Sequence, residues 1–251
     1  RSQTVTGVQT CALPICTTFL ATELVKEFEE YQLLDYPRLV RLNPNVPWKT
    51  RGNGAIVIEL GKGEKKKKKI GDIGKEIHIY EGSPEIDDDI FERTKKVVER
   101  WARFDSEKTN PGVVIGKKRP HRSLYEKAVK DIVSFEKIID ILKNGDYRFK
   151  GYGDNRGLIG ATSALSWTPN DYTYELITYR EEKRWGTERN VPEKDVIELD
   201  KTLKSTFDNY DYEENSTAVD PNSPCPVLYG VRGEDPEELQ NSLNIIDGEP
   251  V

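Results

Sequence analysis

Residues 38–60, RLVRLNPNVPWKTRGNGAIVIEL, contain two short apolar runs separated by a polar loop. The runs at 38–42 and 54–60 are rich in branched side chains and are bounded by Asn, Pro and Gly, which is typical of β-strands. The sequence therefore predicts two strands that flank a long loop at 43–53. Loops of this kind, held by a rigid scaffold, are where binding and catalytic residues concentrate.

The loop at 43–53 has the composition of an anion-binding segment. Its polar side chains include Lys49, Thr50, Arg51 and Asn53. The glycines on either side of Asn53 allow backbone N–H groups to approach an anion closely. This combination suits a phosphate group, but the chain has neither a P-loop nor a G-x-G-x-x-G motif, so a solvated surface loop remains the alternative.

Apolar periodicity predicts helices and strands that alternate along the rest of the chain. Helices are expected within 16–34, with Thr17 or Thr18 near the N-cap, and at 86–103, 123–142, 157–167 and 235–246. Strands are expected within 146–152, 171–180 and 225–233. The lysine-rich stretch 61–76 is expected to be an exposed excursion, and the acidic triplet at 87–89 to cap its helix. This order predicts an α/β (α+β) architecture in two sub-domains, with a boundary near 145.

Three further loops contain candidate binding residues. EKTNPG at 107–112 places Lys108, Thr109 and Asn110 before a Pro-Gly turn. GYGDNRGLIGA at 151–161 contains glycines that either leave helix N–H groups free for a ligand or serve helix–sheet packing. TFDNYDY at 206–212 sets two aspartates among aromatic rings, where a cation could bind, although exposed turn aspartates are the alternative.

Composition excludes several classes of protein. The 251 residues are 33% charged and have a net charge of −6. No apolar run approaches the roughly 20 residues needed to cross a bilayer. The three cysteines show no Cys-x-x-Cys spacing, so neither a disulfide framework nor a zinc knuckle is indicated. We therefore expect a cytoplasmic globular protein.

The N-terminal segment is unlike the rest of the chain. Residues 5–15, VTGVQTCALPI, resemble the in-frame translation of a sequencing adapter, and the chain contains no Met. We expect residues 1–15 to be adapter-derived, and the native fold to begin near Cys16. The alternative is a native strand with Val5, Val8 and Leu13 facing inward, which the irregular spacing disfavours.

Taken together and in their order, these segments resemble the archaeal 2-agmatinylcytidine synthetases, which modify an isoleucine tRNA. The shared segments are CTTFLATELV, YPRLVRLNPNVPWKTRGNGA, SEKTNPGVV, RGLIGA, YELITYR, WGTER, TFDNYDY and PCPVLYGVRGEDPE. They extend from Cys16 nearly to the C-terminus, and RLNPNVPWKTRGNGA, TFDNYDY and CPVLYGVRG are the most specific of them.

The resemblance implies an ATP-dependent ligase that joins agmatine to C2 of the wobble cytidine, so that the tRNA anticodon reads AUA. ATP and Mg²⁺ would be its cofactors. Agmatine and the tRNA anticodon loop would be its partners, with no role for DNA or a membrane. Transfer of a phosphoryl group to the cytosine C2 oxygen would turn that oxygen into a leaving group for the agmatine amine.

The resemblance also implies roles for individual residues. Lys49, Arg51 and Lys108 are expected to clamp ATP or the developing phosphate, and Thr17 to act as a phosphate carrier or as a hydroxyl of the phosphate site. Nucleotide contacts are expected from Thr18, Thr50, Asn53, Thr109 and Asn110. Agmatine contacts are expected from Asp208 or Asp211 at the guanidinium, and from Arg156, Gly157 and Gly160 along the aliphatic part. We expect these distant segments to converge in one pocket.

Members of that family carry a kinase-like domain, a ferredoxin-like domain, an OB-fold and a zinc ribbon. Residues 16–145 would form the first domain and 146–251 the second, with the other two and any metal-ligand set absent. The family's first strand and its Asp-Asp-Thr-Asp-Ser run, suited to Mg²⁺, are replaced here by residues 1–15. We therefore expect the chain to lack that strand and to be inactive in ligation. The alternatives are a non-catalytic RNA-binding module and a small-molecule kinase.

Overall fold

The computed structural model describes residues 5–9, 16–48, 52–85, 87–102, 104–105, 109–222 and 225–251, and for residues 5–9 it describes the backbone. Tertiary contacts divide the chain into two compact units, Arg1–Thr168 (unit 1) and Pro169–Val251 (unit 2). The boundary predicted near 145 falls inside unit 1. Strand β7 (Tyr147–Gly151) pairs with a unit 1 strand, and helix α5 (Gly157–Leu165) packs into a unit 1 core.

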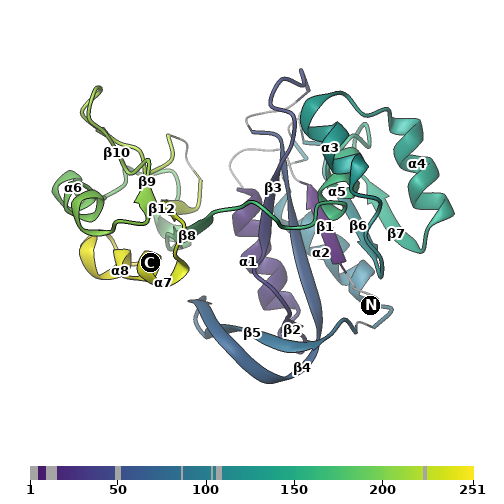
Figure 1. The fold of residues 1–251 in the computed structure, drawn as a ribbon, viewed down its shortest axis with the longest axis horizontal. Helices are drawn as coiled ribbons and strands as arrows, with labels where there is room; N and C mark the ends of the chain where they lie inside the picture. The colour runs from purple at the N-terminus through teal and green to yellow at the C-terminus, as the bar shows by residue number, and fades with distance from the viewer. Residues whose placement is uncertain are drawn as a thin grey trace. The chain divides into compact units, whose positions relative to one another are not determined.

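Unit 1 is built, within the described residues, on a 7-stranded sheet in the order β2-β5-β4-β1-β6-β7, with β3 paired to β4 (Figure 1). Its other strands are β1 (Val5–Gln9), β2 (Gln32–Leu33), β3 (Arg38–Arg41), β4 (Gly54–Asp72), β5 (Glu76–Ser83) and β6 (Gly112–Gly116). Its other helices are α1 (Thr17–Glu27), α2 (Ile90–Trp101), α3 (Ser123–Lys130) and α4 (Phe135–Asn144). The predicted mixed α/β class is confirmed.

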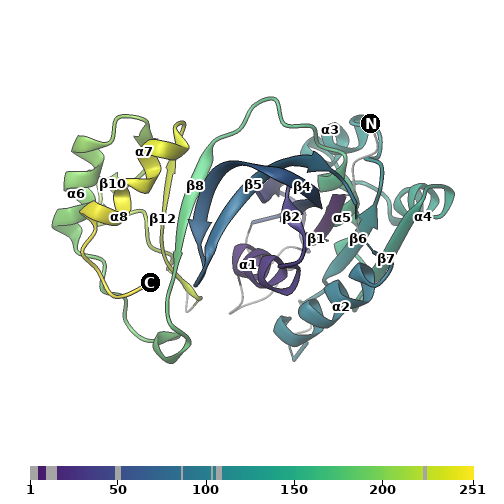
Figure 2. The same ribbon diagram turned by 90° about the horizontal axis from the view of Figure 1, so that it is seen from below.

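Helices cover both faces of this sheet. Along β4, Ala55 and Val57 join one core with α3, α4 and α5, whereas Ile56 and Ile58 join a second core with α1 and α2. This separation follows from the two-residue period of a strand, which sends successive side chains to opposite faces. Figure 2 shows α2 and α4 on opposite sides of β6 and β7. Unit 1 is therefore a three-layer arrangement of helices, sheet and helices.

We expected the chain to lack its first strand, but the backbone of residues Val5–Gln9 forms a strand at this place. Residues Val5–Gln9 form β1, which lies between β4 and β6 and pairs antiparallel with both. Ladder hydrogen bonds use backbone groups that every non-proline residue supplies. A short extended segment can therefore fill this central position with little regard to its side chains. The adapter origin of residues 1–15 stays a prediction.

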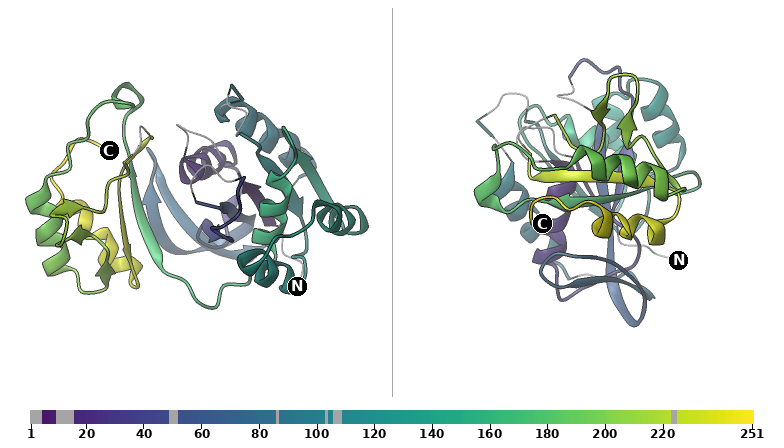
Figure 3. Two further views of the ribbon diagram at one scale, coloured as in Figure 1. Left: turned by 90° about the horizontal axis from the view of Figure 1, so that it is seen from above. Right: turned by 90° about the vertical axis from the view of Figure 1, so that its left-hand side faces the viewer.

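The lysine-rich stretch is a β-hairpin instead of an irregular excursion. β4 continues through Lys65–Lys69 and pairs with β5, and this hairpin extends beyond the rest of the sheet (Figures 1 and 3). Lys69 forms an ion pair with Glu76 across the hairpin, with an Nζ–Oε1 distance of 2.8 Å. Opposite charges on facing strands favour pairing, so the carboxylates of β5 offset part of the positive charge that made the stretch resemble a loop.

The single helix predicted at 123–142 is two helices, α3 and α4. Asp131 leaves the helical conformation (φ −144°, ψ 177°), and its carboxylate accepts a hydrogen bond from the Ile132 N–H at 2.7 Å. Aspartate disfavours helix interiors because its side chain offers the backbone such alternatives. The break leaves Ile132 53% exposed and brings Ile138 into the core instead.

The acidic triplet before α2 does not cap that helix with its side chains. Asp89 is the N-cap residue, but its carboxylate makes no capping hydrogen bond. Asp87 instead accepts a hydrogen bond from the Tyr31 hydroxyl at 2.8 Å, and Asp88 pairs with Arg148 at 2.9 Å. These contacts tie the start of α2 to neighbouring parts of unit 1.

Unit 2 contains a 3-stranded sheet in the order β8-β12-β9 and the small hairpin β10–β11, within the described residues. Its strands are β8 (Tyr174–Tyr179), β9 (Thr206–Phe207), β10 (Tyr210–Asp211), β11 (Ser216–Thr217) and β12 (Val227–Gly233). Its helices are η1 (Glu182–Arg184), α6 (Glu193–Thr202), α7 (Pro236–Gln240) and α8 (Ser242–Ile245), the last two replacing one predicted helix. In the part of the chain described, no helix combines the length and apolarity needed to span a membrane.

Candidate functional site

Strand register brings three polar loops to one edge of the unit 1 sheet. The loop at 43–53 joins the end of β3 to the start of β4, where Arg41 pairs with Gly54. On the neighbouring strands, Gly112 at the start of β6 pairs with both Gln9 and Gly151, which end β1 and β7. The segments before β6 and after β7 therefore leave the sheet at this edge, where β1 also ends.

Hydrogen bonds connect the segment before β6 to the segment after β7. The Asn110 side-chain oxygen accepts a hydrogen bond from the Asp154 N–H at 2.9 Å, and the Pro111 carbonyl accepts one from the Tyr152 N–H at 3.0 Å. Gly153 between them has a φ of +59°, a conformation that disfavours other residues. A Cβ at that position would also lie 1.9 Å from the Asn110 Oδ1 atom. Asn110 thus organises the turn that leads into α5.

Gly112 and Gly157 meet backbone to backbone beneath this turn. A Cβ on Gly157 would lie 2.3 Å from the backbone oxygen of Asn110 and 2.3 Å from the backbone nitrogen of Gly112. A Cβ on Gly112 would lie 2.1 Å from the carbonyl carbon of Gly157. The N–H groups of Leu158 and Ile159 already donate to carbonyls of the preceding turn. Of the two roles considered for the glycines of this segment, the geometry at Gly157 supports close packing. Gly160 is also buried, within α5.

The 43–53 loop reaches the same place through Trp48. The Arg156 guanidinium lies over the Trp48 ring, 4.1 Å from its centroid. Asn53 closes the base of the loop, because its amide donates to the Asn43 carbonyl at 3.0 Å and its carbonyl accepts from the Leu42 N–H at 2.9 Å. These contacts bring described residues of the three unit 1 loops together, whereas the single pocket expected for all the candidate segments stays a prediction. Lys49, Thr50, Arg51 and Lys108, which were expected to hold the phosphates, lie outside the described residues.

A buried hydroxyl is available at this edge. Thr109 is 4% exposed, and its Oγ1 atom has no hydrogen-bond partner among the described residues. Buried hydroxyls are normally paired, because an unpaired one has lost its hydrogen bonds to water. A ligand oxygen would supply the missing partner.

The first turn of α1 follows β1 after a short connection. Cys16 precedes the helix, and its sulfur lies 2.9 Å from the Thr18 hydroxyl. Thr17 is the first residue of α1 and is half-buried. Both threonines therefore lie at the N-terminal end of a helix, where partial positive charge favours phosphate.

The two candidate aspartates belong to unit 2. Asp208 is exposed in a left-handed conformation (φ 54°), between β9 and β10. Asp211 is exposed in β10, and one of its oxygens accepts hydrogen bonds from the N–H groups of Glu213 and Glu214. Nearby, Tyr210 and Tyr212 pack edge to face with ring centroids 5.0 Å apart. The other predicted agmatine contacts, Arg156, Gly157 and Gly160, belong to unit 1.

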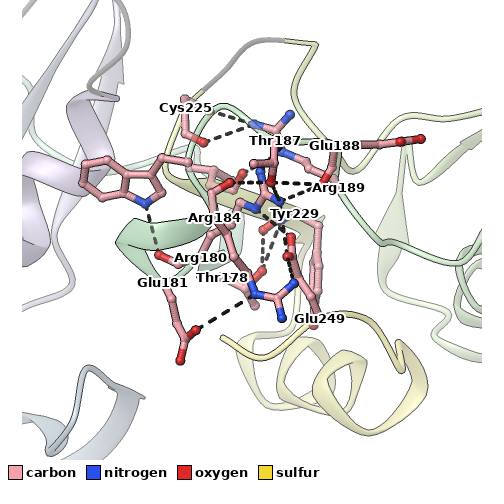
Figure 4. Close-up of polar contacts among 12 residues, drawn as sticks. Thr178, Arg180, Glu181, Arg184, Thr187, Glu188, Arg189, Cys225, Tyr229 and Glu249 are labelled. Carbon is pink, nitrogen blue, oxygen red and sulfur yellow. Dashed lines mark hydrogen bonds and ion pairs between the residues drawn. The ribbon is translucent and has the colours of Figure 1, made fainter.

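Unit 2 also contains a buried charge network that sequence patterns did not predict (Figure 4). Arg180 donates to the Glu249 carboxylate at 2.6 Å, and the two side chains are 1% and 2% exposed. The remaining donors of Arg180 reach the Thr187 carbonyl at 2.8 Å and the Glu188 carbonyl at 2.8 Å, and Arg184 adds a second cation on Glu249 at 2.9 Å. Burial by itself would raise the pKa of Glu249, but its hydrogen bonds and ion pairs with Arg180 and Arg184 outweigh this and lower the pKa.

A second arginine of the same segment holds the approach to β12. Arg189 donates to the carbonyls of Pro221 at 2.8 Å, Cys225 at 3.2 Å and Val227 at 2.9 Å. The segments YELITYR, WGTER and CPVLYGVRG, which are far apart in sequence, thus form one polar framework. In the sequence, the sign of this framework is the close spacing of Arg180, Arg184 and Arg189 after a predicted strand. This spacing by itself does not show whether an arginine binds a ligand or stabilises the fold.

No metal centre is apparent in the parts of the chain that the structure describes. Groups of three or more His, Cys, Asp or Glu side chains that could hold an ion are absent there. The edge where the loops meet therefore offers glycine turns, a buried hydroxyl and a cation on an aromatic ring.

Comparison with known proteins identifies relatives of both units. The TiaS TCKD domain model matches residues 12–154, and the TiaS FLD domain model matches residues 155–251. An isoleucine-tRNA 2-agmatinylcytidine synthetase TiaS from Methanocaldococcus jannaschii is 39% identical over 243 residues, covering 93% of this chain and 53% of that protein. The protein of the same name from Methanosarcina mazei is 36% identical over 250 residues, covering 94% of this chain and 53% of that protein.

Solved structures give the same result. A crystal structure of TiaS in complex with isoleucine tRNA and ATP matches with a TM-score of 0.85 and 32% identity, covering 100% of this chain and 57% of that chain. A crystal structure of TiaS in complex with isoleucine tRNA, AMPCPP and agmatine matches with a TM-score of 0.84 and 30% identity. The match covers 100% of this chain and 58% of that chain. The chain spans about half the length of the curated relatives it matches.

Proposed function

This chain belongs to the TiaS family, and from that premise we propose that it forms part of a cytoplasmic, ATP-dependent ligase that attaches agmatine to C2 of the wobble cytidine in an isoleucine tRNA. The observation on which the proposal rests is the meeting of three loops at one edge of the unit 1 sheet, through the Trp48–Arg156 and Asn110–Asp154 contacts. Relatives named for this reaction, and structures of relatives with tRNA, ATP and agmatine, support it.

We assign the ATP phosphates to this edge. The buried Thr109 hydroxyl would donate to a phosphate oxygen, and Asn110 would hold the turn that faces it. Thr18, Thr50 and Asn53 are the further nucleotide contacts in this proposal, with Asn53 acting mainly by closing its loop. Lys49, Arg51 and Lys108 would neutralise charge in the transition state, and Thr17 would receive or position a phosphoryl group.

The proposed chemistry has two steps at the base and one hydrolysis. The oxygen on C2 of the cytosine attacks the γ-phosphorus of ATP, the bond between the γ- and β-phosphates breaks, and ADP leaves. The primary amine of agmatine then attacks C2 and loses a proton, and the C–O bond to the phosphorylated oxygen breaks, which releases phosphate. Hydrolysis of the β-phosphate of ADP by water gives AMP and the second phosphate. The protein contributes positioning and charge neutralisation to these steps.

Agmatine is a dication, so its guanidinium needs carboxylates. We propose Asp208 and Asp211 for this role, since both are exposed and lie close in sequence to Tyr210 and Tyr212, and tyrosine ring faces attract cations. Gly157 and Gly160 are buried in the packing of unit 1, so we do not assign them to agmatine. Arg156 suits this ligand poorly, because its positive charge would repel the agmatine cation.

Mg²⁺ is expected beside ATP in phosphoryl transfer. Among the described residues, no group of three or more His, Cys, Asp or Glu side chains could hold an ion, so none of them is assigned to Mg²⁺. We therefore derive no step through Mg²⁺. The expectation that this 251-residue chain binds ligands without ligating them stays a prediction.

Calorimetric titration of the chain with ATP, and separately with agmatine, tests the proposal. We expect saturable binding of both, with Asp208→Asn weakening agmatine binding and leaving ATP binding unchanged. Glu198→Gln, which removes a carboxylate elsewhere in unit 2, is the matched control. Mass spectrometry of nucleosides from tRNA incubated with the chain, ATP and agmatine then measures ligation. If the chain fails to bind ATP, or fails to bind agmatine, the proposed function is contradicted.

A further inference from the structure

An exposed cation–π pair joins the 43–53 loop to the turn before α5. Trp48 is 51% exposed, and the Arg156 side chain above its ring is 41% exposed. Tryptophan usually buries most of its surface. A large aromatic surface therefore faces solvent at the edge where the three loops meet.

The guanidinium of Arg156 is held in a defined orientation. Asp154 forms an ion pair with it, with an Nε–Oδ2 distance of 3.2 Å, and also accepts a hydrogen bond from the Arg156 N–H at 3.0 Å. Asp154 is itself fixed by the hydrogen bond from its N–H to Asn110. Among the described residues, Asp154 is the one ionic partner of Arg156. The terminal N–H groups of the guanidinium are therefore available to a ligand.

An aromatic ring stacked with a guanidinium plane is a surface for an unstacked nucleobase. Proteins that recognise single-stranded RNA stack bases on aromatic rings and on arginine planes. An enzyme that acts on a ring atom of a base must also take that base out of its stack. The in-plane N–H groups of the arginine can donate at the same time to a neighbouring phosphate.

We propose that Trp48 and Arg156 form the stacking platform for the nucleobase of the RNA substrate that is to be modified. This inference rests on the proposed function and adds positioning residues for its RNA substrate. The adenine of ATP is the competing occupant. Small-molecule sites usually bury most of their ligand in an enclosed apolar pocket, whereas this pair is about half exposed, which favours a base presented from solvent by a larger molecule.

The test measures binding of the 251-residue chain to a dye-labelled anticodon stem-loop by fluorescence anisotropy. One RNA carries cytidine at the wobble position, and the other carries an abasic nucleotide there. Base–aromatic stacking of this kind predicts about tenfold tighter binding of the cytidine RNA by the wild-type chain. Trp48→Ala should bring the ratio of the affinities for the cytidine RNA and the abasic RNA close to one, and Arg156→Gln should lower this ratio. Trp48→Phe should keep it within about threefold of wild type.

Tyr172→Ala is the matched control, because Tyr172 is a similarly exposed aromatic residue (54%) in unit 2. It should leave the preference unchanged. Circular dichroism melting of each variant checks that it folds. The proposal is overturned if the wild-type chain shows no preference for the cytidine RNA, or if Trp48→Ala weakens both RNAs equally.

Titration with ATP separates this inference from the proposed function. Trp48→Ala should leave ATP affinity unchanged, and a loss of ATP affinity would instead identify the pair as an adenine site and overturn the proposal. A wild-type chain that binds ATP and agmatine without a base preference contradicts this inference alone. A chain that fails to bind ATP or agmatine contradicts the proposed function.

Discussion

The guanidinium of Arg180 and the carboxylate of Glu249 form a buried ion pair in unit 2, with an Nε–Oε1 distance of 2.6 Å and almost no exposure of either side chain. The pair connects the end of β8 to a segment close to the C-terminus. A buried pair of this kind adds little net stability over an apolar replacement, but losing one partner leaves an uncompensated charge in the interior.

Glu249→Ala should therefore destabilise unit 2 by about 3–5 kcal/mol. Urea unfolding followed by Trp185 fluorescence measures this, since the Trp185 indole N–H donates to the Arg180 carbonyl at 3.2 Å. Glu182→Ala removes an exposed carboxylate from the same region and should change the free energy of unfolding by less than about 0.5 kcal/mol. Equal effects of the two substitutions would contradict the role of the buried pair.

The same ion pair predicts a pH dependence. The pKa of Glu249 is lowered in the folded state from 4.5, so the unfolded state binds the proton more readily. Its contribution to stability is therefore present above that ordinary value and is lost as pH falls through the lower, folded-state pKa. The stability difference between wild type and Glu249→Gln should be largest near neutral pH and should shrink below pH 4.5. A difference that stays constant from pH 7 to pH 3 would show that the carboxylate charge is not responsible.

Alanine at Gly157 or at Gly112 should disrupt unit 1. The added Cβ would lie 2.3 Å or closer to backbone atoms, which cannot move as a flexible side chain can. We expect a loss of at least about 1–3 kcal/mol, the usual cost of overpacking. Gly71→Ala is the control, because nothing lies within 4 Å of its Cβ position and its φ is not positive. In thermal unfolding, the midpoint temperature of Gly71→Ala should equal or exceed that of wild type. A similar loss of stability in all three variants would contradict the packing argument.

Thr109→Val should affect stability and ATP binding in opposite directions. The substitution removes a buried hydroxyl that has no partner among the described residues, so the ligand-free chain should keep or gain stability. If that hydroxyl donates to a phosphate oxygen, ATP affinity should fall about tenfold. Thr94→Val is the contrast, because its hydroxyl already donates to the Ile90 carbonyl at 2.7 Å. It should lower stability without changing ATP affinity, and unchanged ATP binding by Thr109→Val would remove Thr109 from the site.

Local patterns predicted most elements and missed where the chain interrupts them. The strands on either side of the 43–53 loop, the strand at β7 and the helix at α5 lie where periodicity placed them. The break at Asp131 was missed because apolar spacing continues across it at near-helical intervals. The family resemblance, which rested on whole segments and their order, is confirmed by both domain models.

The sequence by itself determined the family, the mixed α/β class and the loops that contain the candidate residues, because these depend on residue types and spacings along the chain. The tertiary structure alone decided that Gly157 serves close packing, that residues 5–9 occupy a central strand, and that Trp48 and Arg156 stack. Each of these features depends on which backbone or side chain, distant in sequence, lies next to the residue in the folded chain. That pairing is set by strand register and packing across the sheet, which residue spacing along the chain does not encode directly.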